Sequence, residues 1–509
     1  VGLTQGWQAP TCDDSDWSTL APGEPWEFSG LDYDGVAWYR TQITLPDWPC
    51  VYLGFGGVDD AATLWIEDEQ VGTWKELGPR AVSLDLLQFG AAGDRLHLTF
   101  RLEDHGGYGG LKQAVLLGPE PRAVMSEAQY ITWLADAHPD WPMPGWAQDR
   151  PFAWTMSGAP KAANESLLSA DGAIAPWASA PTVEAWLYDP TSDTLAYGAQ
   201  NGIRFSLSNQ HLPIPQTEWE AFGVILKSTL FHDMEDSAVR WLVSAQNTTE
   251  AGRDLFLLLV VRPFAVNQAA APICAIGWQD KTHLWVNGVP FLVAATPPAE
   301  AGVGLLEEVM AATLQGQAPD QDVLACAQAG DGAAVLVYPL RLEGGQSTSL
   351  HVAFPAAFGD PFPTAEVNAE ARLTETIAAW EELTGRVRLD LPDDLVEMGV
   401  PASVGYLLLA LDPDGPHPGP LAHDALWVRD AAYIGLALLQ FGHADAVRAY
   451  IPAILAAQEP NGRVPPIQGE KIPWYDEEWD AQGQAIFLVT TYYHYTGDVN
   501  TLRQWYPAL

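Results

Sequence analysis

One stretch decides the fold of the C-terminal part of the chain: residues 423–433 read His-Asp-Ala-Leu-Trp-Val-Arg-Asp-Ala-Ala-Tyr. A loop rich in proline and glycine ends here, and a helix is predicted over Asp430–Phe441, ended by Gly442. The same 3.6-residue period recurs around it in a helix that ends at Gly385 and in helices predicted over Asp394–Leu411, Ala444–Gln458, Asp480–Tyr495 and Val499–Trp505. The chain beyond about Pro363 is therefore expected to form helical hairpins.

Upstream of these helices the hydrophobic period changes to two. Short alternating runs such as Leu96–Phe100 fill residues 1–118, divided by glycine, proline and aspartate. A second β-rich zone, with strand candidates such as Phe256–Val261, covers residues 121–362 and is too long for one small sandwich. We therefore expect a β-sandwich, a large two-sheet domain, a linker helix over 363–389 and a helical part over 390–509.

The charge balance excludes one class of partner. The 509 residues carry 24 Lys+Arg against 65 Asp+Glu, a formal net charge of −41. Nucleic-acid binding depends on clustered basic residues, so no nucleic-acid partner is expected. Apolar residues make up 48% of the chain, which argues against disorder. The longest apolar run, Leu255–Val261, is too short to span a bilayer, so no membrane span is expected.

Cysteine and histidine usage gives little sign of metal or redox chemistry. Cys12 and Cys50 lie in one predicted unit and Cys274 and Cys326 in another, so two bridges and four buried thiols are equal alternatives. The 11 histidines show no ligand spacing, and motifs of serine hydrolases, NTPases and zinc enzymes are absent. No metal or cofactor is expected. Because the numbering starts at Val1, we expect a processed or trimmed start. The acidic, tryptophan-rich and lysine-poor composition fits an extracellular or periplasmic protein, whose signal is absent from the numbering.

Four segments occur in a characteristic order near the N-terminus. They are residues 12–17 (Cys-Asp-Asp-Ser-Asp-Trp), 35–40 (Gly-Val-Ala-Trp-Tyr-Arg), 56–65 (Gly-Gly-Val-Asp-Asp-Ala-Ala-Thr-Leu-Trp) and 103–111 (Glu-Asp-His-Gly-Gly-Tyr-Gly-Gly-Leu). This succession resembles the jelly-roll sugar-binding domain of family 2 glycoside hydrolases, although Cys12 replaces a usual aromatic residue and residues 67–69 replace the usual Asn-Gly hairpin. The resemblance implies an accessory jelly roll beside a catalytic unit. We expect Trp17, Trp38 and Trp65 to be core residues rather than a sugar-stacking platform.

The C-terminal motifs also follow a known order. After residues 423–433 come 458–465 (Gln-Glu-Pro-Asn-Gly-Arg-Val-Pro), 474–484 (Trp-Tyr-Asp-Glu-Glu-Trp-Asp-Ala-Gln-Gly-Gln) and 495–498 (Tyr-Thr-Gly-Asp). This is similar to the opening helices of the six-hairpin (α/α)6 barrel of glucoamylase-like glycosidases. The resemblance implies that Arg429 and Asp430 hold sugar hydroxyls in the −1 subsite, that Trp427 lies beside them, and that Trp474 and Asp480 form another wall. The structural alternative is an Arg–Asp pair at a helix N-terminus, where aspartate stabilises the helix dipole.

The catalytic carboxyls are expected elsewhere. An inverting glycosidase needs an acid and a base about 6.5–9.5 Å apart. In the glucoamylase-like pattern both follow the segment that ends at Asp498, so we expect them beyond residue 509. A twelve-helix barrel needs on the order of 190 residues, whereas residues 390–509 provide 120, and a continuing or separate chain would supply the second half. Within the chain, Glu478 and Asp480 are the catalytic candidates of the acidic group at 476–480.

These motifs together predict a glycoside hydrolase that acts on an oligo- or polysaccharide by inversion. Another six-hairpin chemistry, such as that of a rhamnosidase, debranching enzyme or phosphorylase, fits the same helices. The alternative from a different class is a non-catalytic carbohydrate-binding or structural surface protein built from the same domains.

Overall fold

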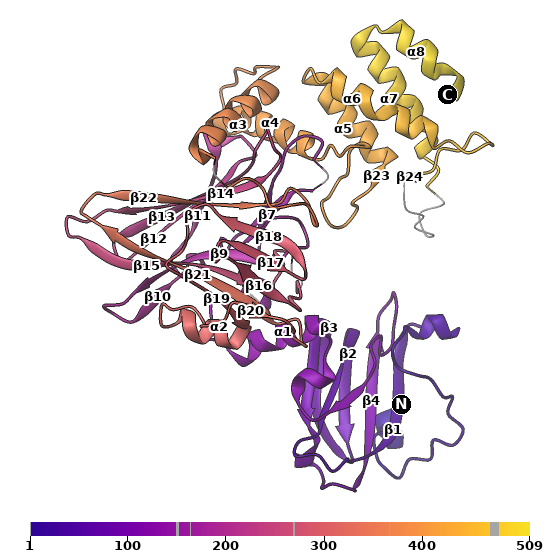
Figure 1. Ribbon diagram of the computed structural model, residues 1–509. Helices are drawn as coiled ribbons and strands as arrows, with labels where there is room; N and C mark the ends of the chain where they lie inside the picture. Colours follow the sequence, from indigo (N-terminus) through magenta and orange to yellow (C-terminus); the bar gives the residue numbers. More distant parts are fainter. Residues whose placement is uncertain (1, 149–151, 163, 268–269, 366, 469–477) are drawn as a thin grey trace.

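The computed structural model describes residues 2–148, 152–162, 164–267, 270–365, 367–468 and 478–509. Three parts follow one another along the chain: an N-terminal sheet, a larger pair of sheets and a group of helices (Figure 1). The predicted order of β structure first and helices later is confirmed. Within the described ranges, no helix has both the length and the hydropathy needed to cross a bilayer.

The N-terminal part is one antiparallel sheet with strand order β1-β4-β2-β3, and β5 pairs with β2. Its strands are β1 (Gly35–Thr44), β2 (Tyr52–Ile66), β3 (Glu69–Asp85), β4 (Arg95–Asp104) and β5 (Leu116–Gly118). Strand alternation buries a core that includes Leu53, Phe55, Leu64 and Phe100. The hairpin between β2 and β3 forms without an Asn-Gly pair, because Glu67 itself takes a left-handed φ of 55°. Strand β2 pairs with β5 through residues 52–54 and with β4 through residues 61–66, and its register against β3 shifts between these two halves.

The central part consists of two larger sheets packed face to face. The first has eight strands, β6 (Trp154–Ser157), β7 (Ser166–Ser169), β8 (Ile174–Ala175), β9 (Thr182–Asp189), β10 (Thr194–Ala196), β15 (Arg253–Arg262), β19 (Glu300–Leu305) and β21 (Gly332–Leu342). The second has nine, β11 (Arg204–Leu207), β12 (Pro215–Ala221), β13 (Val224–His232), β14 (Val239–Asn247), β16 (Ile276–Gln279), β17 (His283–Val286), β18 (Val289–Ala294), β20 (Val323–Leu324) and β22 (Ser347–Phe354). Their inner faces share a core that includes Trp241, Leu257, Phe291 and Leu336.

Two helices close the other face of the eight-stranded sheet. Helix α1 (Glu127–Ala137) and helix α2 (Leu306–Thr313) share a separate core with the outward side chains of β9, β15 and β21, among them Trp186, Val260 and Val335. Both faces of that sheet are therefore buried, which explains the near-continuous apolar run of β15.

The four described cysteines form no disulfide, so the bridge alternative is not realised. Cys12, Cys50 and Cys274 are partly buried and Cys326 is exposed. The alternative of four buried thiols is therefore wrong as well.

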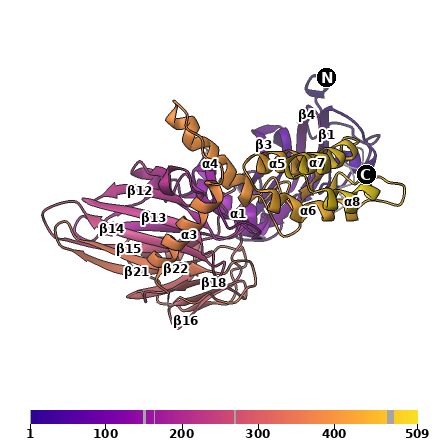
Figure 2. The same ribbon diagram turned by 90° about the horizontal axis from the view of Figure 1, so that it is seen from above.

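The helices after residue 368 are confirmed close to their predicted bounds. They are α3 (Ala369–Thr384), α4 (Asp394–Leu409), α5 (Val428–Gln440), α6 (Ala444–Ala456), α7 (Ala481–Thr496) and α8 (Val499–Trp505). Seen from above, α3 and α4 lie between the sheets and the group α5–α8 (Figure 2). One hydrophobic cluster joins all six helices to the nine-stranded sheet, because Trp380 of α3 and Leu408 of α4 share it with Phe231 of β13. Helix α3 thus contributes to the same hydrophobic core as the later helices.

Candidate functional site

A short two-stranded ladder positions the motif at residues 423–433. Strand β23 (Leu426–Trp427) pairs with β24 (Ile467–Gln468), and the Val428 amide donates to the Pro466 carbonyl at 2.9 Å. Trp427 occupies the N-cap position of α5, so Arg429 and Asp430 lie in the first helical turn. The backbone just before Arg429 is therefore held by the β23–β24 pairing, and the backbone after it by helix α5.

Arg429 reaches from α5 to the start of α7. Its Nε donates to Asp480 Oδ2 at 2.6 Å and its NH2 donates to Asp480 Oδ1 at 2.8 Å, across a sequence separation of 51 residues. The same NH2 group lies 3.2 Å from Glu478 Oε2. The structure therefore brings together three of the predicted site residues, Arg429, Glu478 and Asp480, which we call the arginine group.

The arginine group is open to solvent, and its charges shift the pKa values of Arg429 and Asp480. The side chains of Arg429 and Asp480 are 47% and 40% exposed. Hydrogen bonding to Asp480, with the charges of Glu478 and Asp430, raises the pKa of Arg429. The hydrogen bonds from Arg429 in turn hold the pKa of Asp480 below its usual range. A carboxyl that stays ionised is poorly suited to be a general acid, but it can accept hydrogen bonds from hydroxyl groups.

The remaining predicted site residues differ in their surroundings. Trp427 is only 6% exposed, and its ring lies tilted against that of His423, with centroids 5.0 Å apart. The Trp427 ring is therefore packed inside the protein and offers no open face on which a sugar could stack. Asp430 is half-buried in the first turn of α5, where it also favours the helix dipole. Trp474, like Asp476 and Glu477, lies outside the described residues.

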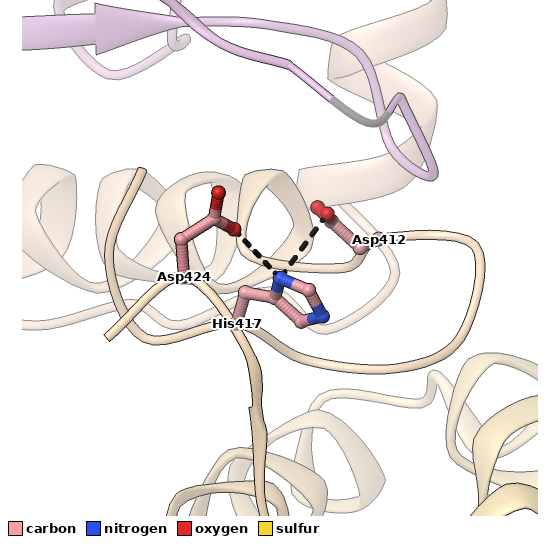
Figure 3. A group of neighbouring side chains, drawn as sticks. All are labelled: Asp412, His417 and Asp424. Atoms are coloured by element: carbon pink, nitrogen blue, oxygen red, sulfur yellow. Dashed lines mark hydrogen bonds and ion pairs between the residues drawn. The ribbon is translucent and has the colours of Figure 1, made fainter. Parts of the chain in front are cut away.

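A second group surrounds His417 in the loop between α4 and β23 (Figure 3). Its Nδ1 lies 2.8 Å from Asp424 Oδ1 and 3.3 Å from Asp412 Oδ2, and its Nε2 lies 3.0 Å from Asp414 Oδ1. We call His417, Asp412, Asp414 and Asp424 the histidine group. In contrast to the arginine group, His417 is only 15% exposed and Asp412 only 10%.

Burial and like charge act together on the histidine group. Burial, with the neighbouring Asp424 and Asp414, raises the pKa of Asp412 to about 6. Burial alone would lower the pKa of His417, but the hydrogen bond to Asp424 and the surrounding carboxylates raise it. The sequence analysis missed this group because it sought histidines at mutual ligand spacing. The segment Asp412-Pro-Asp414-Gly-Pro-His417, which concentrates oxygen and nitrogen donors in one turn, is the signal that could have found it.

The N-terminal part has a hollow lined by tryptophans. Trp65 is buried and stacks on Trp38 with centroids 5.5 Å apart. Trp7, Trp17 and Trp38 are half-buried and line a hollow of about 520 Å³. The core assignment therefore holds for Trp65, whereas Trp17 and Trp38 each present part of their ring to the surface.

Comparison with known proteins places the fold. No protein-family model and no curated protein matches the sequence. A bacterial glucoamylase solved with acarbose matches 70% of this chain with a TM-score of 0.50 and 11% identity, and the match spans 57% of that enzyme. A putative kojibiose phosphorylase from the human microbiome (10% identity, 70% and 51% of the two chains, TM-score 0.36) and a β-glucuronidase of Bacteroides uniformis (11%, 70% and 26%, TM-score 0.22) are more distant. Over 70% of its length the chain thus shares its fold with that glucoamylase structure, and it covers little more than half of that protein.

Proposed function

We propose that this chain is part of a secreted carbohydrate-active enzyme, a glycoside hydrolase acting on an oligo- or polysaccharide, and that the arginine group binds the sugar in its −1 subsite. The observation that carries the proposal is the two-point pairing of Arg429 with Asp480, 47% and 40% exposed, beside Glu478. An arginine fork offers donors and two carboxylates offer acceptors, so together they match the alternating hydroxyls of a pyranose. The fold shared with a glucoamylase supports the same substrate class.

The proposal assigns binding, not proton transfer, to these residues. Inverting hydrolysis needs a protonated carboxyl and an ionised carboxylate on opposite sides of the scissile bond. The lowered pKa of Asp480 keeps it ionised, and both it and Glu478 are engaged by Arg429. We therefore assign acid and base to other carboxylates of the complete (α/α)6 barrel, in which helices α3–α8 would form the first part.

Sugar binding by the purified chain tests the proposal. Maltose and acarbose are titrated calorimetrically into the wild type, Arg429→Ala and Arg503→Ala. Arg503 is an exposed arginine of α8 outside the group, so its removal matches the charge change without touching the site. Arg429→Ala should weaken binding at least tenfold, because hydrogen bonds to a charged group contribute about 1.5–3 kcal/mol. Equal affinity in the wild type and Arg429→Ala, or no binding of either sugar by the wild type, contradicts the proposal.

A second candidate is carbohydrate binding by the N-terminal part without catalysis. The half-buried Trp17 and Trp38, which line the 520 Å³ hollow beside Asp14 and Arg40, favour it, since sugars bind to aromatic faces flanked by polar groups. In the same titration, loss of binding in Trp17→Ala but not in Arg429→Ala would select this candidate.

A further inference from the structure

The donor atoms of the histidine group lie at the spacing of ligands around one ion. Asp412, His417 and Asp424 each offer an atom within 4.8 Å of the others, and two of these separations are 2.8 and 3.3 Å. When metal–ligand bonds are about 2.1 Å long and meet at right angles, adjacent donors lie about 3 Å apart. The two carboxylates therefore lie near ligand spacing from His417 Nδ1, and all three donors are close enough to converge on a single cation.

The other ring nitrogen of His417 supports this geometry. Nε2 lies 3.0 Å from Asp414 Oδ1, so a proton on Nε2 is held by that carboxylate. Without a metal, Nδ1 carries the proton that it donates to Asp424. A cation would displace that proton and leave the Nδ1 lone pair as a ligand between Asp412 and Asp424. A carboxylate that fixes the tautomer from behind is the usual partner of a metal-bound histidine.

An independent observation comes from the preceding β part. Glu165, just before β7, is only 9% exposed, and among the described residues no other residue hydrogen-bonds its carboxylate. The ionisable groups that shift its pKa all belong to the histidine group: burial first, then Asp412 and Asp424, raise it to about 7, and His417 opposes them. The Lys161 amide donates to the Leu411 carbonyl at 2.7 Å, which joins the segment before β7 to the start of the loop after α4. Glu165 thus lies near enough to the histidine group to respond to its charges.

The histidine group and Glu165 together carry more negative than positive charge. Asp412, Asp414, Asp424 and Glu165 carry −4 when ionised, and a protonated His417 supplies +1, which leaves −3. In the described part of the chain, no lysine or arginine forms an ion pair with any of these carboxylates. Asp414 and Asp424 are 56% and 53% exposed, so the cost of burying an uncompensated carboxylate applies to Asp412 and Glu165. The net charge of −41 raises the local concentration of cations further.

We propose that Asp412, His417 and Asp424 bind one divalent transition-metal ion, Mn²⁺ or Zn²⁺, with Glu165 as a further negative charge nearby. The mixture of one imidazole nitrogen with carboxylate oxygens favours these ions over Ca²⁺ and Mg²⁺, which prefer oxygen alone. The ion would lie in the loop that leads into β23 and α5. It lies outside the arginine group and does not depend on the sugar-binding proposal.

Metal titration of the full chain tests this site. The protein is stripped with EDTA, dialysed at pH 7.5 and titrated with Mn²⁺, followed by the loss of the free-ion electron paramagnetic resonance signal, and with Zn²⁺ by calorimetry. One ion should bind per chain and raise the thermal midpoint by several degrees, since a ligand that binds only the folded state stabilises it. His417→Gln and Asp424→Asn should weaken binding at least tenfold. His494→Gln, an exposed histidine of α7, should bind like the wild type.

A spectroscopic readout keeps the test valid if a variant fails to fold. Bound Mn²⁺ in the wild type should show nitrogen coupling in its electron spin-echo modulation, because His417 Nδ1 is a ligand. Three results overturn the proposal. One is a wild type that binds no more Mn²⁺ or Zn²⁺ than His417→Gln, which leaves His417 as a protonated imidazole between carboxylates. The others are an ion bound without nitrogen coupling and binding of Ca²⁺ alone.

Discussion

The arginine group and the histidine group flank the same short strand, β23, and each places carboxylates around one basic side chain, yet they differ in every property that decides what they can do. Arg429 and Asp480 are 47% and 40% exposed, whereas His417 and Asp412 are 15% and 10% exposed. Arginine stays charged at any pH that a protein tolerates, and its fork satisfies both oxygens of one carboxylate. Histidine carries at most one charge and is shared by three carboxylates.

This difference suits the arginine group to binding a ligand and the histidine group to stabilising the fold. An exposed, self-neutralised pair keeps lone pairs and donors available to a polar ligand and contributes little to folding. In the histidine group, His417 and Asp412 are mostly buried while Asp414 and Asp424 are 56% and 53% exposed. The mostly buried pair contributes to folding, with a sign that depends on its countercharge. Substitutions in the two groups should therefore separate sugar affinity from stability.

Removal of the histidine should have the largest effect on stability. His417→Leu leaves Asp412 and Glu165 buried without the imidazole, and breaking a buried ion pair costs about 3–5 kcal/mol. We expect a loss of this order in the urea unfolding of the helical part, followed by far-ultraviolet circular dichroism at pH 7.5 with EDTA present. His494→Leu is the matched control. An unchanged midpoint in His417→Leu would show that the buried group does not brace the fold.

A buried histidine without adjoining carboxylate partners sharpens the contrast. His351 of β22 is 7% exposed, and burial, helped by the charge of Arg240 and opposed by Asp233, lowers its pKa to about 4. The unfolded chain takes up this proton near the ordinary value of 6.5, so His351 contributes its full stability above pH 6.5 and loses it as the pH falls towards 4. The loss is roughly 2 kcal/mol at pH 4.5.

Substitution isolates this contribution. His351→Leu should unfold at a urea midpoint that falls less than that of the wild type between pH 7 and pH 4.5, with tryptophan fluorescence reporting on the sandwich. Other groups titrate equally in both proteins, so the difference in slope belongs to His351. Parallel slopes would contradict the assignment of a neutral buried imidazole.

The sequence predicted helices well because their period and caps are local. Helix α8 has its predicted bounds, and α4 begins at Asp394 as expected, since Asp393 caps it through two backbone amides. The pairing of Arg429 with Asp480 was not predictable in the same way. Both residues were candidates, but their contact depends on how α5 packs against α7, which periodicity does not contain.

The histidine group shows a different limit of sequence reasoning. Its residues come from one loop, and the neighbouring Glu165 comes from the preceding β part. No short motif connects Glu165 with residues 412–424, because tertiary packing alone brings them together. The prediction that the N-terminal tryptophans are core residues was incomplete for a related reason. Aromatic residues in alternating strands predict a core, but the pattern does not show which strand lies at the edge of the sheet. Trp38 lies in the edge strand β1, and part of its ring lines the hollow.

The smallest stability effect should come from the group that matters most for sugar binding. Arg429→Ala should change the free energy of unfolding of the helical part by about 1 kcal/mol or less, because exposed ion pairs are screened by water and salt. The lowered pKa of Asp480 means that its contribution is present above its usual pKa and is lost only in strong acid, so the small effect should be the same from pH 5 to pH 8. Urea unfolding in parallel with His417→Leu measures both points. A loss above about 2 kcal/mol would show that Arg429 mainly clamps α5 to α7, and the structural alternative of an Arg–carboxylate pair at a helix start would then replace the sugar site.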